Sequence, residues 1–292
     1  MFKGSIVALI TPMLPDGALD EAAFARLIGW RIESGTSAIV PTGTTGESPT
    51  LTHDEHRRLI DLAVRTVAGR IGVLAGTGSN STAEAIATTR HAKEAGVDAA
   101  LVVTPYYNKP TQDGLYRHFM AIADAVDLPI IIYNIPPRSV IDMSVETMAR
   151  LARHPNIVGV KDSTANLLRP LQIRRAVGPD FCQLSGEDGT ALAFNVAGGS
   201  GCISVTANVA PVLCAQMQAA WTGGDVRTAM ALQDKLLPLH EALFTESNPA
   251  PVKYAASLLG RANEFCRLPM APLQDRTRAL VRAAMEEVGL LG

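Results

Sequence analysis

The sequence predicts an α/β protein, a (β/α)8 TIM barrel with a C-terminal helical extension. Eight short β-rich runs alternate with helix-length amphipathic segments, which is typical of successive βα units on a parallel sheet. Eight parallel strands are the number that closes such a barrel. After the eighth run the pattern becomes helical only, so the 292 residues fit a barrel of about 220 residues followed by a C-terminal helical appendage.

The expected strands follow one another in chain order. They are SIVALI from Ser5, SAIV from Ser37, IGVLAG from Ile71, AALVV from Ala99, PIIIYN from Pro129, NIVGVK from Asn156, FCQLS from Phe181 and GCISV from Gly201.

Helix signals lie between these runs. Thr52 precedes HDEHRRLIDLAV, with Glu55 three residues on, a pattern that predicts a capping box. Ser81 precedes TAEAIATTRHAKEAG with Glu84 three residues on, which repeats the pattern, and Gly96 predicts the end of that helix. Three helical segments follow the last strand: DVRTAMALQDKLLPLHEALF, PVKYAASLLG and LQDRTRALVRAAMEEVG. We therefore expect a catalytic barrel over residues 1–224 and a C-terminal helical domain over residues 225–292.

Composition narrows the class of protein. Hydrophobic residues make up 47% and charged residues 18%, with a formal charge of -2 and no basic run, so a small-molecule partner is favoured over nucleic acid or an anionic membrane. The N-terminal IVALI is too short for a signal peptide, and no run has the 18 or so apolar residues of a membrane span. We expect a cytoplasmic protein. The scattered cysteines Cys182, Cys202, Cys214 and Cys266 fit reduced core thiols better than a zinc site.

The barrel predicts where function lies, because catalytic groups of such barrels follow the carboxyl ends of the strands. The segments after the eight runs are rich in hydroxyls, glycines and small polar groups: TP at Thr11, PTGTTGES at Pro41, TGSN at Thr77, TPYYN at Thr104, IPPRS at Ile135, DST at Asp162, GED at Gly186 and TAN at Thr206. Polar ends that converge around an apolar barrel predict a ligand site.

Lys161 is unusual because it ends the apolar run NIVGVK. With a period of two, Ile157, Gly159 and Lys161 share one face, while Val158, Val160 and Asp162 share the other. If the first face points to the barrel axis, Gly159 leaves room beside the lysine. A nucleophilic lysine needs such desolvation, since an unperturbed one is almost fully protonated at pH 7. The alternative is a strand-end lysine that extends to solvent.

Several motifs together carry a family resemblance. They are Gly43-Thr44-Thr45-Gly46-Glu47 after the second run, Tyr106-Tyr107 after the fourth, Tyr133 and Arg138 around the end of the fifth, and VGVKD. With GSIVALITPM and RLPMAPL near the two ends, the chain resembles the dihydrodipicolinate synthase and N-acetylneuraminate lyase family of Schiff-base pyruvate aldolases. Each motif also has a simpler interpretation: Tyr133 as core packing, the glycine loop as a tight turn, and Tyr106-Tyr107 as a surface turn or subunit contact.

The resemblance implies a catalytic role for four residues. Lys161 would form an imine with pyruvate, so no cofactor and no metal are implied. Tyr133 would relay protons, linked through Thr45 to Tyr107 in a chain of hydroxyl groups. In the family this last tyrosine reaches into the neighbouring subunit's site, which implies a homo-oligomer, at least a dimer and by expectation a dimer of dimers.

The resemblance also implies substrate contacts. Thr44 and Thr45 would bind the pyruvate carboxylate, and Gly186 and Ile203 would border the pyruvate pocket through backbone groups. Arg138 suits a second substrate with a carboxylate, because a guanidinium binds a carboxylate bidentately. This favours the branch that condenses pyruvate with L-aspartate 4-semialdehyde to 4-hydroxy-tetrahydrodipicolinate, in lysine and diaminopimelate biosynthesis.

Other functions stay open. An N-acetylneuraminate lyase or a 2-keto-3-deoxy sugar acid aldolase would use the same scaffold. From another class, the chain could be a catalytically inactive ligand-binding barrel, and Arg138 could form a structural ion pair.

A further set of residues matches the feedback site for L-lysine in lysine-sensitive members of the family: Ser48, His53, His56, Asn80, Glu84 and Tyr106. Glu84 could pair with an ammonium group, while Tyr106 and Asn80 hold a carboxylate. The alternative for His53 and His56, one helical turn apart, is metal ligation, although no third ligand stands nearby.

Overall fold

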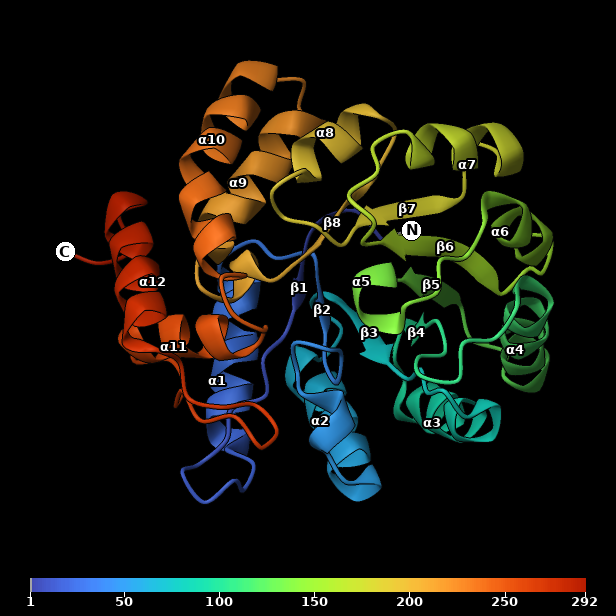
Figure 1. Cartoon of the computed structure of the whole chain (residues 1–292), viewed down its shortest axis with the longest axis horizontal. Coiled ribbons are helices and arrows are strands. Elements are labelled where there is room, and N and C mark those ends of the chain that lie inside the picture. The colour runs from blue at the N-terminus through green and yellow to red at the C-terminus, as the bar shows by residue number, and fades with distance from the viewer. Residues whose placement is uncertain (1) are drawn as a thin grey trace.

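The computed structural model describes residues 2–292 and has a closed barrel of eight parallel strands, each paired with its neighbours in chain order (Figure 1). The strands are β1 (Gly4–Ala8), β2 (Ala38–Val40), β3 (Gly72–Gly76), β4 (Ala99–Val103), β5 (Ile130–Asn134), β6 (Ile157–Asp162), β7 (Cys182–Ser185) and β8 (Gly201–Ser204). Pairing of β1 with β8 closes the barrel. The predicted fold class is confirmed, and every expected strand lies within two residues of an observed one.

Helices surround the barrel in the order expected for βα units. They are α1 (Glu21–Glu33), α2 (His53–Val67), α3 (Thr82–Ala95), α4 (Gln112–Ala125), α6 (Val145–Leu151), α7 (Arg169–Val177), α8 (Ala191–Val196) and α9 (Pro211–Thr222). Three short helical segments lie in the loops after β2, β5 and β8: η1 (Ser48–Thr50), α5 (Pro136–Ser139) and η2 (Thr206–Asn208).

Two of the predicted helix starts can be compared in detail. Thr52 and Glu55 form the expected capping box at α2. At α3 the Ser81 side chain accepts from the Glu84 N–H, but the Glu84 carboxylate accepts from the Ser79 hydroxyl at 2.5 Å and does not complete a box. Gly96 ends α3 in the left-handed conformation, with φ 89°.

Side chains of alternate strand residues form two apolar layers. The inner layer fills the barrel and includes Ile6, Leu74, Ile131, Leu184 and Ile203. The outer layer lies between the strands and the helices and is larger. The barrel is therefore a packed core, with space for chemistry only at the ends of its strands.

Strand β6 has a bulge that changes the predicted faces. Ile130 pairs with Ile157, whereas Ile131 pairs with Gly159, so Val158 is an extra residue on β6. Ile157 consequently packs in the outer layer, and Val158 packs against the inner one. The prediction that Ile157 shares the face of Lys161 is wrong for this reason.

Three helices follow the barrel: α10 (Val226–Ala242), α11 (Ala250–Leu258) and α12 (Asp275–Glu287). Helix α10 packs on α9, and α12 packs on α10 and α11, so these helices lie together at one side of the barrel (Figure 1). The boundary between residues 1–224 and 225–292 stays a prediction.

Two further observations bear on the class of protein. Between residues 2 and 292, no helix combines the length and the apolar character that crossing a membrane requires. All four cysteines are free, and Cys182, Cys202 and Cys214 are buried as expected. Cys266 is only half-buried, since it lies in the loop between α11 and α12 rather than on a core element.

Candidate active site

Lys161 and Tyr133 lie side by side at the carboxyl ends of β6 and β5. They are paired across the two strands, and each is 6% exposed. The Lys161 Nζ lies 4.1 Å from the centre of the Tyr133 ring, a cation–π contact. Lys161 is therefore buried towards the barrel interior, and the interpretation that it extends to solvent is wrong.

A glycine makes room for Lys161, but it is not the predicted one. The position of a Cβ on Gly159 is filled by the Cys182 carbonyl and by Ile131, 2.4 and 3.0 Å away. A Cβ on Gly186, after β7, would instead meet the Lys161 Cε at 2.9 Å. Gly186 also donates its N–H to the Asp162 carbonyl at 2.7 Å. Gly186 therefore borders Lys161, and Gly159 allows close packing of β6 on β7; contact of Gly186 with pyruvate stays a prediction.

The loop after β2 presents Thr44 and Thr45. Two turn hydrogen bonds shape it: Gly46 N–H donates to the Gly43 carbonyl and Glu47 N–H donates to the Thr44 carbonyl, both at 3.1 Å. Thr45 is buried, and its hydroxyl accepts from the Asn248 amide at 2.9 Å. Ile203 lies in the inner layer on β8, and its predicted place at the border of a pyruvate pocket stays a prediction.

Arg138 is exposed and lies on α5, directly after the strand that carries Tyr133. Its guanidinium donates to the Asn248 carbonyl at 3.2 Å. Asn248 thus contacts both Thr45 and Arg138 from the segment before α11. Asn248 was not predicted from the sequence. Its only signal is the Asn-Pro step, which marks a turn but not a contact with the barrel.

The predicted chain of hydroxyl groups is not formed within one chain. Tyr107 is 89% exposed, with φ 69°. In the part of the chain that the structure describes, neither Tyr133 nor Tyr107 hydrogen-bonds to Thr45, whose partner is Asn248. Contact of Tyr107 with a neighbouring subunit stays a prediction.

One cavity of about 640 Å³ is lined both by residues of the candidate active site and by predicted regulatory residues, although Lys161 and Thr45 are not among its lining residues. Thr44, Tyr133 and Arg138 line one part. Most of the predicted L-lysine contacts line the rest: Ser48, His53, His56, Glu84 and Tyr106. Asn80 is not among the lining residues, and its carbonyl accepts from the Asn108 amide at 2.9 Å.

The polar groups of this cavity have definite partners. His56 Nε2 lies 2.9 Å from the Gly76 carbonyl, and burial lowers the His56 pKa to about 4 against the opposing effect of that hydrogen bond. The ring is neutral at pH 7 and has its proton on Nε2. His53 Nε2 lies 3.3 Å from a Glu84 carboxylate oxygen. Among residues 2–292, no three His, Cys, Asp or Glu side chains come together as metal ligands.

A carboxylate near Lys161 has a shifted pKa. Burial raises the pKa of Glu187, the neighbouring Asp188 acts in the same direction, and Lys161 opposes the shift. The loop after β7 therefore brings a carboxylate into the electrostatic range of the candidate nucleophile.

A buried ion pair links the end of the loop after β2, residues 43–47, to helix α11. Lys253 on α11 is fully buried, and its Nζ lies 2.6 Å from the Glu47 carboxylate and 2.9 Å from the Thr11 carbonyl. The second Glu47 oxygen accepts from the Arg267 N–H at 2.9 Å. Sequence analysis missed this pair, although a lysine inside the apolar run PVKYAAS is the same signal that drew attention to Lys161.

Comparison with known proteins agrees with this geometry. The family model described as "Dihydrodipicolinate synthetase family" matches residues 1–288. The 4-hydroxy-tetrahydrodipicolinate synthase of Acidiphilium cryptum is 67% identical over the whole of both chains. Among solved structures, the pyruvate-complexed dihydrodipicolinate synthase of Acinetobacter baumannii, described as chloride-inhibited, superposes with a TM-score of 0.98 and 46% identity over all of both chains. The lysine-bound enzyme of Cyanidioschyzon merolae gives a TM-score of 0.96 and 40% identity over 99% of each chain.

Proposed function

The chain belongs to the dihydrodipicolinate synthetase family, and we propose that it condenses pyruvate with L-aspartate 4-semialdehyde to 4-hydroxy-tetrahydrodipicolinate through an imine on Lys161. The enzyme is a lyase of lysine and diaminopimelate biosynthesis. One observation carries the proposal: a buried lysine at the end of a barrel strand, with its Nζ 4.1 Å from the centre of a tyrosine ring.

Lys161 acts as the nucleophile. Its neutral amine attacks the ketone carbon of pyruvate, and loss of water gives a protonated imine. The imine withdraws electrons from the adjacent methyl group, which loses a proton to give an enamine. The enamine carbon then forms a bond with the aldehyde carbon of L-aspartate 4-semialdehyde, and the aldehyde oxygen takes up a proton to become the hydroxyl group. The amino group that came from the semialdehyde attacks the imine carbon, which closes the ring and releases the Lys161 amine. The imine itself is the electron sink, so no cofactor or metal is part of the scheme.

The neighbouring groups supply protons and hold the substrate. Tyr133 relays protons at the imine and aldol steps, in a chain with Thr45 and with Tyr107 of a neighbouring subunit. The Thr44 and Thr45 hydroxyls and loop N–H groups bind the pyruvate carboxylate, and Gly186 and Ile203 border it. Support comes from the placement of Thr44 and Tyr133 on one cavity.

Arg138 selects the second substrate by pairing with its carboxylate. Its exposed guanidinium lines the same cavity as Tyr133, with one bond to Asn248 and donors left for a ligand. An N-acetylneuraminate lyase or a 2-keto-3-deoxy sugar acid aldolase needs no such partner.

A substrate panel tests this assignment. Wild type should condense pyruvate with L-aspartate 4-semialdehyde and leave N-acetylneuraminate and 2-keto-3-deoxy sugar acids uncleaved. Arg138→Ala should raise KM for the semialdehyde at least about ten-fold, the loss of roughly one charged hydrogen bond, with a smaller effect on KM for pyruvate. Arg153→Ala, at an exposed arginine, is the control. Cleavage of a sugar acid instead would overturn the choice of substrate, and no turnover and no imine would favour the inactive ligand-binding barrel.

We propose that the active form is a homo-oligomer, a dimer of dimers. Tyr107 is 89% exposed and is free to enter a neighbouring subunit's site. Exposed apolar side chains lie on α7, in the loop before it and at the end of α8: Leu167, Leu168, Leu171 and Val196. Sedimentation should give a tetramer for wild type and a dimer for Leu168→Asp. A wild-type monomer with full activity would overturn the proposal.

We propose that L-lysine regulates the enzyme at the far part of the cavity. The Glu84 carboxylate, now near His53, would pair with an ammonium group, and Tyr106 and Asn80 would hold the carboxylate. Support comes from the shared cavity and from a relative whose structure has lysine bound. L-lysine should inhibit wild type and inhibit Glu84→Gln far less, with D-lysine as the control ligand. Activity that does not change up to millimolar L-lysine would contradict the proposal.

A further inference from the structure

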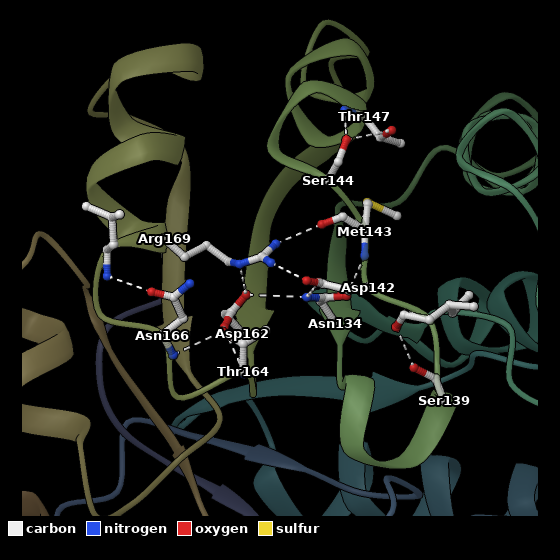
Figure 2. Close-up of polar contacts among 12 residues, drawn as sticks. Asn134, Ser139, Asp142, Met143, Ser144, Thr147, Asp162, Thr164, Asn166 and Arg169 are labelled. Carbon is white, nitrogen blue, oxygen red and sulfur yellow. Dashed lines mark hydrogen bonds and ion pairs between the residues drawn. The ribbon is translucent and has the colours of Figure 1, made fainter.

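A polar cluster, buried except for Asp142, lies on the outer side of the two strands that carry Lys161 and Tyr133. We name it the Arg169 cluster; it consists of Asn134, Asp142, Asp162 and Arg169. Asn134 and Asp162 are paired across β5 and β6, one residue after the Tyr133 and Lys161 pair. Because side chains alternate along a strand, they point away from the barrel axis, towards α7 and the loop before α6 (Figure 2).

Arg169 connects the members of the cluster (Figure 2). One Nη donates to the Met143 carbonyl at 2.8 Å, and the other donates to the Asp142 carboxylate. Its Nε lies 3.6 Å from the nearer Asp162 oxygen. The Arg169 side chain is only 10% exposed and that of Asp162 only 2%, so solvent screens the pair weakly.

Asn134 closes the loop that follows β5. Its amide donates to the Asp142 carboxylate at 2.8 Å and lies 3.5 Å from an Asp162 oxygen. Its carbonyl oxygen accepts from the Met143 N–H at 3.0 Å. The segment from Asn134 to Met143, which contains Arg138, is thereby fixed at both ends.

The other end of the cluster fixes the turn after β6. One Asp162 oxygen accepts from both the N–H and the hydroxyl of Thr164, at 2.9 and 2.5 Å. Burial raises the pKa of Asp162, while Thr164, Arg169 and Asn134 act against the shift. The charged neighbours of this carboxylate are Arg169 from α7 and Asp142 from the loop after β5.

The three members that Arg169 connects therefore belong to segments that carry residues of the proposed reaction. Asp162 follows Lys161, Asn134 follows Tyr133, and Asp142 ends the loop that carries Arg138. None of the four lines the cavity of the candidate active site.

We infer that Arg169 is a positioning residue, which holds the ends of β5 and β6 and the Arg138 loop in the geometry that condensation requires. The inference rests on the proposed function. Its physical basis is that, among residues 2–292, Arg169 is the cation paired with both Asp142 and Asp162, so its loss leaves Asp162 buried without this cationic partner. Small displacements of reacting groups reduce rates strongly, by up to roughly a hundred-fold for about 1 Å.

The test compares three variants with wild type. Arg169→Met removes the positive charge. Arg169→Lys retains the charge but cannot donate to the Asp142 carboxylate and the Met143 carbonyl at the same time through a planar guanidinium. Asp142→Asn, at a side chain that is 45% exposed, perturbs the same cluster from its solvent side and keeps the test available if Arg169→Met does not fold. Arg175→Met, on the exposed side of α7, is the matched control.

Arg169→Met should lower kcat at least about ten-fold and raise KM for the semialdehyde more than KM for pyruvate, with Arg169→Lys and Asp142→Asn between it and wild type. Arg175→Met should match wild type. A lower melting temperature with unchanged kcat and KM would show a merely structural cluster and overturn the inference.

Amide hydrogen exchange separates this inference from the proposed function. Peptides that cover residues 130–143 and 157–164 should exchange faster in Arg169→Met and not in Arg175→Met. Unchanged protection there would overturn the inference even if the enzyme is active. An inactive wild type would instead refute the proposed function, and the exchange result would still decide whether Arg169 holds these segments.

Discussion

At the scale of single residues, the Lys161 side chain is confined by the backbone of the next strand. Gly186 follows β7, and a Cβ there would lie 2.9 Å from the Lys161 Cε and 1.9 Å from the Ser163 hydroxyl oxygen. The hydroxyl can rotate away, whereas the middle of the lysine side chain has little freedom between Tyr133 and β7. Glycine at residue 186 therefore leaves the space that the Lys161 side chain occupies.

Gly186→Ala should therefore reduce activity more than stability. The added methyl group displaces the Lys161 amine, and we expect kcat to fall at least about ten-fold with a modest change in melting temperature. Gly189→Ala is the matched control in the same loop, because a Cβ at that residue would meet nothing within 4 Å. Equal kcat values for the two variants would show that Gly186 does not set the position of the amine.

At the scale of elements, helix α11 fixes the glycine loop after β2. The contact is the buried pair of Lys253 and Glu47, with side chains 0% and 2% exposed. Glu47 has a left-handed backbone, with φ 57°, directly after the residues that bind the carboxylate in the proposed reaction. The C-terminal helices therefore take part in shaping the active-site loop, in addition to covering the barrel.

Removing one partner of this pair should be costly. Lys253→Met leaves a buried carboxylate without its cation, and we expect the free energy of unfolding to fall by about 3 to 5 kcal/mol. The double variant with Glu47→Gln should recover most of that loss, because the amide oxygen can still accept from Arg267 while the charge is gone. Chemical denaturation measures both. A double variant as unstable as the single one would mean that packing, and not the unpaired charge, causes the loss.

The elements also show what the sequence could predict. Alternation of β-rich and helical runs located all eight strands, because each strand is a local apolar run between turn signals. The bulge at Val158 was not predictable, since a period of two assumes a regular strand. The proximity of Lys161 and Tyr133 was predictable, because they end neighbouring strands of one barrel. The contacts of Asn248 and Lys253 with the loop after β2 were not predictable, because nothing local to their segments encodes how the C-terminal helices pack on the barrel.

At the scale of the whole molecule, buried histidines link stability to pH. His118 on α4 is 5% exposed, with its Nδ1 2.9 Å from the Thr82 hydroxyl. Burial lowers its pKa to about 4. The unfolded chain takes up the proton near pH 6.5, so the stabilising contribution is present above pH 6.5 and is lost as the pH falls towards 4. Burial lowers the pKa of His56 and of His240 as well.

His118→Gln should accordingly weaken the acid sensitivity of the fold. On going from pH 8 to pH 5 the wild type loses about 2 kcal/mol of unfolding free energy through this group, and the variant should lose that much less. Urea denaturation at the two pH values measures the difference. His53→Gln, at an exposed ring, controls for removal of an imidazole as such. An identical loss in wild type and His118→Gln would contradict the assignment.

Reduction with borohydride in the presence of pyruvate shows whether Lys161 forms the imine. Wild type and Lys161→Ala are incubated with pyruvate, reduced, digested and mapped by peptide mass. The account predicts a reduced pyruvyl adduct on the peptide that contains Lys161, none on the buried Lys253, and no adduct in Lys161→Ala. An adduct on another lysine, or none on Lys161 in a wild-type enzyme that turns over pyruvate, would contradict the account.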